Sequence, residues 1–356
     1  MALMRFPFVR ATPLQQDLHG VKTVKTIQPN FQVLDSVEKL CATWLGHAGF
    51  LVQFPAEPGH RPLRVVFDPI FSDRAYPSAW VGPRRRLPPP CKIQELPDVD
   101  FIAVSHNHYD HCDLDALKAL WKKSRAVDFL VPLGVKTILE SVGIPADQIY
   151  ECDWWDKVAF PPTAGRKAGY SFTCTPAQHN SGRGMLDQNW TLWCSWVVQQ
   201  IPEGAPAAAS VYFAGDTGYQ TAEGPCPAFK EIGTKLGPFD LAMIPIWSGA
   251  SLTFLGKMGY KARPHPGRSP QLSDDQHLVT LHATPEDAVR LAADVRARHA
   301  LAMHFATFAG SDDEALEPVV RLAQAQGGTA DWRAEGGFGA IDVGECVALD
   351  VGVPRD

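Results

Sequence analysis

Hydrophobic positions in this chain gather in short runs that are bounded by turn residues. The runs are partly β-branched or aromatic and too short for most helices, which is typical of buried strands. We therefore expect strands at residues 43–54, 64–68, 101–105, 129–131, 171–175, 193–199, 211–214, 241–246 and 300–304.

Three helices have recognisable ends. Asp113, Thr284 and Ser311 each precede an amphipathic segment and can accept a hydrogen bond from the first free backbone N–H groups. Arg296 and Arg298 are expected to close the second helix, and a Gly-Gly pair the third. Many strands with a few covering helices predict a layered α/β architecture.

Composition excludes several classes of protein. The 356 residues carry a net charge of −6, which argues against a nucleic-acid partner. The longest apolar runs fall far short of the roughly 20 residues that span a bilayer. The eight cysteines form no CxxC pair, so we expect reduced thiols rather than disulfides or a zinc ribbon.

We expect a single catalytic domain at residues 41–352, because no change in composition separates two domains. Residues 1–40 form an N-terminal extension, and a Gly/Pro/Ser-rich insertion lies at about 249–275. The expected location is intracellular, in the cytoplasm or at the periphery of a membrane. Two arginines and no acid in the first ten residues leave a mitochondrial location open.

The strongest chemical signal is the sequence HNHYDH at residues 106–111. It supplies His106, His108, Asp110 and His111 directly after an expected strand. Imidazole and carboxylate together suit zinc and the neighbouring first-row metals. A polar loop rarely has this pattern by chance, so we expect a metal site here.

Three further positions repeat the placement of a His or Asp just beyond an apolar strand: His179, Asp216 and His304. If these strands lie side by side, the seven side chains meet at one edge of a sheet. His106, His108 and His179 would then hold one ion, and Asp110, His111 and His304 a second.

Asp216 would bridge the two ions through its two carboxylate oxygens. Two ions about 3.5–4 Å apart share a water whose pKa falls towards 7, which gives hydroxide at neutral pH. Zinc is the default metal, while iron or manganese fits the same donors. The catalytic set expected on this basis includes Asp110 and Asp216.

The motif together with these three residues resembles the metallo-β-lactamase superfamily. The resemblance implies an αβ/βα four-layer sandwich with the metals at the strand-end edge between two sheets. More narrowly, five stretches resemble N-acyl-phosphatidylethanolamine-hydrolysing phospholipase D. They begin at residues 176, 192, 213, 237 and 285 and read PAQHNSGRG, LWCSW, FAGDTGY, GPFDLA and PEDAVR.

That family cleaves the phosphodiester bond between phosphatidic acid and an N-acylethanolamine, which implies a phospholipid substrate. The resemblance implies that Asp68 orients the metal-binding loop, and it places the catalytic candidate His282 near the site. For both residues an ordinary structural role remains an alternative. Leu281 departs from a polar residue of the family.

Four residues are candidates for substrate binding, each with a structural alternative. Arg183 can meet a phosphate through its planar guanidinium or can hold a loop. Tyr109, Tyr219 and Trp247 can shape the pocket or belong to the core.

Contact with a membrane surface would involve Trp80 and the basic run Arg84–Arg86, which is equally typical of a solvated loop. The insertion offers Leu252, Phe254, Leu255 and Met258 for the same purpose, although packing on the domain or an oligomer contact is the preferred reading of these apolar residues.

The alternative enzymatic function is hydrolysis of another ester, a lactone or a thioester, for instance in secondary metabolism, because the pocket rather than the hydroxide selects the substrate. A non-enzymatic binding protein is the alternative outside enzymes, and the complete set of seven ligands weighs against it.

Overall fold

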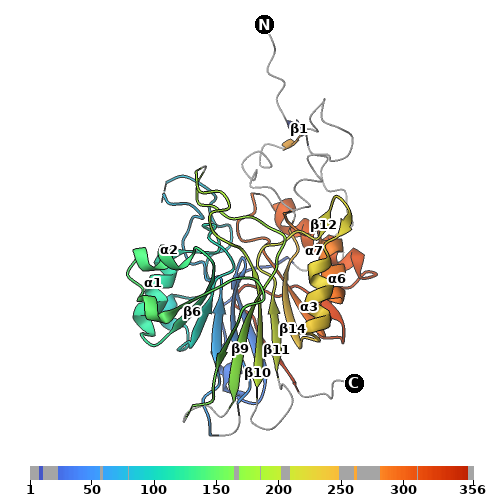
Figure 1. The fold of residues 1–356 in the computed structure, drawn as a ribbon. Coiled ribbons are helices and arrows are strands. Elements are labelled where there is room, and N and C mark those ends of the chain that lie inside the picture. Colours follow the sequence, from blue (N-terminus) through green and yellow to red (C-terminus); the bar gives the residue numbers. More distant parts are fainter. Residues whose placement is uncertain are drawn as a thin grey trace.

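Two seven-stranded sheets face each other and form the centre of the structure (Figure 1). The computed structural model of the chain describes residues 8–10, 23–56, 59–78, 80–163, 168–184, 186–201, 209–247, 260–262, 281–310 and 312–351. Helices α1 and α2 cover the outer face of one sheet, and α3, α6 and α7 that of the other (Figure 1). The expected αβ/βα sandwich is therefore confirmed.

The two sheets each contain seven strands in a similar arrangement. Along the first sheet lie, in order, β18 (Cys346–Leu349), β2 (Leu40–Gly46), β3 (Gly49–Gln53), β4 (Arg64–Phe67), β5 (Phe101–Ala103), β6 (Asp128–Pro132) and β7 (Ile149–Cys152). Along the second lie β17 (Gly337–Gly339), β16 (His299–Met303), β14 (Leu241–Pro245), β11 (Ser210–Phe213), β10 (Ser195–Ile201), β9 (Gly169–Thr175) and β8 (Lys157–Phe160).

Each sheet is antiparallel in one half and parallel in the other. The parallel neighbours are β4 to β7 in the first sheet and β11, β14, β16 and β17 in the second. Ligands of open α/β sheets bind beyond the carboxyl ends of parallel strands. Here β4 and β16 end directly before Asp68 and His304, and two residues separate the ends of β5 and β11 from the HNHYDH loop and Asp216.

The core between the sheets fixes their relative position. The rings of Phe67 on β4 and Phe213 on β11 stack with centroids 4.8 Å apart. Trp196 on β10 is fully buried, and its indole N–H donates to the carbonyl of Val104 at 2.9 Å. Both contacts join the end of a strand in one sheet to the other sheet, so they hold the two halves of the strand-end edge together.

Helices and short pairs complete the fold. The α-helices are α1 (Leu114–Lys123), α2 (Lys136–Ser141), α3 (Pro227–Lys235), α6 (Pro285–Asp294) and α7 (Asp312–Ala325). The 3₁₀ helices are η1 (Phe31–Asp35), η2 (Ile93–Glu95) and η3 (Ala146–Gln148). The remaining strands pair two by two: β1 (Phe8–Arg10) with β15 (Tyr260–Ala262), and β12 (Gln220–Thr221) with β13 (Gly224–Pro225). Among the described residues, no helix has the length and apolar composition needed to cross a bilayer.

Two predicted helix starts are confirmed in detail. The Asp113 carboxylate accepts from the backbone N–H of Ala116, and the Thr284 hydroxyl accepts from that of Asp287. The predicted end of α6 is wrong, because the helix stops at Asp294 and leaves Arg296 and Arg298 beyond it. Arg296 has φ = +62°, which turns the chain out of the helix and towards β16.

The strand expected at residues 43–54 is instead a hairpin of β2 and β3. Gly46 and His47 have φ values of +100° and +52°, which no continuous strand contains. Four strands at the edges of the sheets were not predicted: β7, β8 and β18 are short and in part exposed, and the three-residue β17 is short and contains two glycines. Most of the insertion expected at 249–275 lies outside the described residues.

The chain before β2 packs onto the domain in part. The backbone N–H of Ile27 donates to the carbonyl of Val343 at 2.8 Å, and Val24 is buried. All eight cysteines are free thiols, as expected from their spacing.

Asp113 offers a test of how the strand-end loops are anchored. Besides capping α1, its carboxylate accepts from the backbone N–H groups of Phe71 and Ser72 at 3.0 and 2.9 Å. We expect Asp113→Ala to lower the free energy of unfolding by about 2 to 4 kcal/mol, through the lost cap and two unpaired N–H groups. Urea denaturation measures this. The exposed Asp115→Ala in the same turn should change the free energy by less than about 0.5 kcal/mol, and equal effects of the two substitutions would refute the anchoring role.

Candidate metal centre

The HNHYDH loop leaves β5 and is held in place by Arg183. One guanidinium nitrogen of Arg183 donates to the carbonyls of Asn107 and Cys112 at 2.9 and 3.0 Å. The guanidinium also lies 3.9 Å from the centre of the Tyr109 ring, within the range of a cation–π contact. These contacts fix the backbone that carries the histidines, and they correspond to the loop-holding alternative for Arg183, with carbonyls in place of a carboxylate.

Three imidazoles form the first cluster of potential ligands. His106 Nε2 lies 2.8 Å from His108 Nδ1, and His179 Nε2 lies 3.3 Å from the same atom. His179 follows β9 on the second sheet, so the cluster joins both sheets. The other ring nitrogen of His179, Nδ1, donates to the backbone carbonyl of Leu281 at 3.0 Å, which leaves Nε2 of His179 available to bind a metal.

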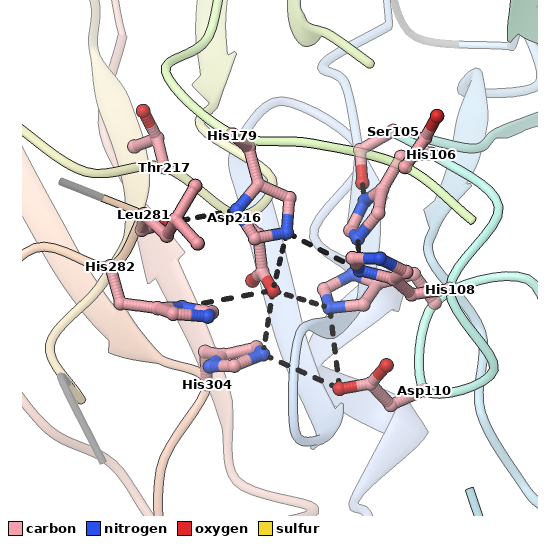
Figure 2. A network of polar contacts seen from close by, with 12 residues as sticks. Ser105, His106, His108, Asp110, His179, Asp216, Thr217, Leu281, His282 and His304 are labelled. Carbon is pink, nitrogen blue, oxygen red and sulfur yellow. Dashed lines mark hydrogen bonds and ion pairs between the residues drawn. The ribbon is translucent and has the colours of Figure 1, made fainter. Parts of the chain in front are cut away.

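A second cluster contains Asp110, His111, His304 and His47, with one donor atom from each within 4.8 Å of the others. Asp216 lies between the clusters (Figure 2). Its Oδ2 is 3.2 Å from His111 Nε2, 3.0 Å from His304 Nε2 and 3.6 Å from His179 Nε2. The structure therefore brings all seven predicted ligands together. Their individual assignment as ligands stays a prediction.

Several atoms at the centre of this arrangement are buried without a hydrogen-bond partner among the described residues. They include His111 Nε2, His304 Nε2 and Asp216 Oδ1. A buried polar atom without a partner costs about 1–3 kcal/mol. A divalent cation would satisfy these nitrogen and oxygen lone pairs together, so the residues present fit a metal.

Burial and mutual contact set the charges at this site. Burial holds the pKa values of His106 and His179 well below the ordinary value. Burial also disfavours charge on Asp216, but the imidazoles of His111 and His304 outweigh it and hold its pKa well below the usual range. Burial alone would lower the pKa values of His111 and His304, but the carboxylates of Asp216 and Asp110 outweigh it, holding the pKa of His111 well above its ordinary value and raising that of His304 to about 9. A divalent cation would therefore displace a proton from each of these two rings on binding.

Asp68 orients two of the histidines. Its buried carboxylate accepts from His111 Nδ1 at 2.7 Å and from the Ser105 hydroxyl at 2.5 Å. The Ser105 oxygen in turn accepts from His106 Nδ1 at 2.8 Å. These hydrogen bonds turn Nε2 of both imidazoles to the centre, which is the role expected for Asp68.

A cavity of about 430 Å³ opens above the clusters. Tyr109, Trp247 and His282 line it, as their predicted roles require. Arg183 and Tyr219 are not among the lining residues, and Tyr219 is buried with its hydroxyl donating to Asp294 at 2.8 Å. The geometry thus gives no support to a substrate contact by either residue.

Sequence reasoning missed three groups at this centre. Ser105 and the Leu281 carbonyl each hold an imidazole, and His47 lies beside Asp110. The signal for His47 was present in the sequence GHAG at residues 46–49, where glycines interrupt an apolar run. The carbonyl of Leu281 gives no signal, because any residue supplies one.

A family model described as the beta-lactamase superfamily domain matches residues 63–305. The chain belongs to the metallo-β-lactamase superfamily. The solved structure of CmlA, a diiron beta-hydroxylase from Streptomyces venezuelae, matches 88% of this chain over 54% of its own length, with a TM-score of 0.54 and 18% identity. At this identity the likeness concerns the fold alone.

Two relatives indicate which members of the superfamily this chain resembles. N-acyl-phosphatidylethanolamine-hydrolyzing phospholipase D 1 of Caenorhabditis elegans is 37% identical over 86% of this chain and 75% of its own length. The mitochondrial enzyme of that name from Saccharomyces cerevisiae is 31% identical over 83% of this chain and 52% of its own length. The chain is a metal-dependent hydrolase of the metallo-β-lactamase fold that resembles these phospholipases, and its candidate His/Asp clusters support the binding of divalent metal.

Substitution of Asp68 tests whether the orientation of the His111 ring affects metal affinity. Asp68→Asn exchanges a charged acceptor for an amide, so His111 loses its preferred orientation. We expect metal affinity to fall about 10- to 100-fold. Competition with a chromophoric chelator measures this. Asp98→Asn, at an aspartate whose side chain is 71% exposed, is the control and should leave the affinity unchanged. Equal affinities of all three proteins would remove Asp68 from the metal centre.

Proposed function

We propose that the chain is a phosphodiesterase of the phospholipase D type, which releases N-acylethanolamine and phosphatidic acid from N-acyl-phosphatidylethanolamine. The observation that carries the proposal is the convergence of seven His and Asp side chains, five of which line an apolar-walled cavity. The reaction named for the C. elegans and yeast relatives supplies the substrate class.

His106, His108 and His179 are proposed to hold one divalent ion, and Asp110, His111 and His304 the other. Asp216, between the two sets, is proposed to bridge them. Such a pair of ions supplies a hydroxide at neutral pH and charge neutralisation at the phosphate oxygens. The residues contribute a fixed, water-poor frame, because Asp68, Ser105 and the carbonyl of Leu281 fix the ring orientations described above.

His282 is proposed to contact the reacting phosphodiester. Its Nδ1 lies 3.9 Å from Asp216 Oδ2, and its ring lines the cavity. Burial lowers its pKa to about 4, so the ring is neutral at pH 7. A neutral imidazole can donate an N–H hydrogen bond to a phosphate oxygen or to the oxygen of the leaving alcohol. In the overall reaction, water adds its oxygen to phosphorus and its proton to that alcohol.

The walls of the cavity favour an apolar ligand above the metal floor. Tyr76, Tyr109, Trp247, Leu281 and Phe308 contribute to them. A mostly apolar pocket with a few convergent polar groups is usual for small-molecule sites. It suits an N-acyl chain attached to a phosphate headgroup.

Product analysis on purified, metal-loaded protein tests the proposed reaction. We expect release of N-acylethanolamine from N-acyl-phosphatidylethanolamine to exceed turnover of a panel of lactones and thioesters. Asp216→Asn should lower the rate by about 10²- to 10³-fold or more, because it removes the bridging charge, while the protein stays folded. Lactone or thioester turnover without phospholipid turnover would favour the rival substrate class. Full activity of the Asn variant would refute the bridging role.

Exposed apolar residues lie on two loops that also contribute residues to the cavity lining. Trp80 and Val81, from the loop after β4, are 88% and 61% exposed, and Leu186 and Trp190, from the loop before β10, are 88% and 79% exposed. The Tyr76 and Tyr109 rings lie 5.9 Å apart, and Arg183 covers Tyr109, so contacts connect the two loops. We propose that this rim touches the membrane surface that supplies the substrate.

The basic run considered for this purpose gives less support. Arg84 pairs with Asp73 and Arg86 with Asp312, so their charges are partly neutralised. Arg85 is buried, contrary to its assignment to a solvated loop. Apolar contact rather than attraction to anionic lipid is therefore the proposed mode of binding.

Vesicle co-sedimentation tests the rim. The double substitution Trp80→Ser and Leu186→Ser should weaken binding to phosphatidylcholine–phosphatidylethanolamine vesicles about tenfold or more, since each side chain contributes roughly 1.5–3 kcal/mol when buried in lipid. Turnover of a short-chain, water-soluble phosphodiester should be unchanged. Ile201→Ser, at an exposed residue at the carboxyl end of β10, is the control, because the loop that carries Leu186 lies at the other end of this strand. Equal binding of all three proteins would contradict the proposed rim.

A further inference from the structure

His47 lies at the metal centre although it precedes the HNHYDH loop by almost sixty residues. It occupies the turn between β2 and β3, with φ = +52°, and it is fully buried. The turn is possible because Gly46, with φ = +100°, carries no side chain. A Cβ there would lie 3.2 Å from the guanidinium of the buried Arg85. The local sequence therefore places a buried histidine in contact with the candidate metal centre.

The side chain of His47 contacts one proposed ligand. Its Nε2 lies 2.9 Å from Asp110 Oδ2, a hydrogen-bond distance. The same carboxylate oxygen is 3.6 Å from His304 Nε2 and 3.7 Å from His111 Nε2, so it is the oxygen that faces the second cluster. Donation from His47 Nε2–H thus directs the oxygen that would bind an ion.

The backbone of His47 contacts another proposed ligand. Its carbonyl accepts from the backbone N–H of His304 at 3.0 Å and from the indole N–H of Trp44 at 2.8 Å. Its own N–H donates to the Thr307 hydroxyl at 2.7 Å. His304 has φ = +59°, an unfavourable backbone conformation for histidine that these contacts hold in place.

We propose that His47 is a positioning residue for the second metal ion, which it serves by orienting Asp110 through its side chain and His304 through its backbone. The inference rests on the dinuclear centre of the proposed function. It extends that centre by a group outside the seven ligands. The expected consequence is selective. Loss of the His47 side chain should weaken the binding of the second ion and leave the binding of the ion held by His106, His108 and His179 unchanged.

Two substitutions separate the side-chain contact from the backbone contact. Asparagine tolerates positive φ well, so His47→Asn keeps the turn, but its shorter amide does not reach Asp110. Glutamine places an amide N–H close to the position of Nε2 and can donate to Asp110. We expect the Asn variant to bind one of two ions about 10- to 100-fold more weakly and the Gln variant to recover most of that loss.

Metal per chain, measured by elemental analysis after dialysis against graded chelator, gives both affinities. Thermal unfolding of the metal-free proteins checks that the variants fold. The control is His299→Asn, which removes a half-buried histidine that bonds the carbonyl of Trp332 far from the clusters, and it should leave both ions unchanged.

The outcomes separate this inference from the proposed function. Two ions of unchanged affinity in His47→Asn would overturn the positioning role and leave the dinuclear hydrolase intact. Equal losses in the Asn and Gln variants would also overturn it, since the hydrogen bond would then be irrelevant. A wild-type chain that holds a single ion would overturn the dinuclear centre and the role of His47 with it.

Discussion

Unpaired nitrogen and oxygen atoms at the strand-end edge impose the main constraint on this structure. His111 Nε2, His304 Nε2 and Asp216 Oδ1 are buried without a hydrogen bond among the described residues, and the two imidazole nitrogens have only ion-pair contacts, at 3.2 and 3.0 Å, with Asp216 Oδ2. Folding therefore brings together lone pairs that, at about 1–3 kcal/mol each, are unfavourable without a cation. Metal binding and stability are linked at this edge, because a ligand that binds only the folded chain stabilises it.

The two sheets together supply the donor groups that surround this centre. A single loop can supply adjacent donors, but it cannot surround an ion alone. The first sheet contributes the HNHYDH loop and Asp68, and the second contributes His179, Asp216 and His304. Phe67 against Phe213 and Trp196 against the carbonyl of Val104 lock the sheets together directly below these residues. Packing of the core thus determines whether two half-sites form one centre, which explains why the donors lie so far apart along the chain.

The sequence was sufficient for features whose cause is local. A strand followed by His or Asp can be recognised from neighbours alone, and the cap at Asp113 depends on residues three positions apart. It was insufficient where a partner is chosen in three dimensions. Arg183 has a guanidinium suited to phosphate, yet the folded chain offers it the carbonyls of Asn107 and Cys112 instead. His47 was hidden inside an apolar run, and its contact with Asp110 spans 63 positions.

The side chains of the candidate metal centre and those of the cavity wall come from different parts of the fold. The metal-facing side chains follow the ends of core strands, and further hydrogen bonds fix their orientation, so their geometry changes little unless the sheets move. The apolar wall of the cavity includes Tyr76 from the loop after β4, and the side chains of Tyr76, Trp80 and Leu186 on the loops are exposed rather than packed in the core. Leu281 combines both roles, because its carbonyl holds His179 while its side chain lines the cavity. Substitution at such a position alters the substrate contact without disturbing the metal, since every residue keeps the carbonyl. A fold built in this way can retain one hydrolytic centre while its substrates change.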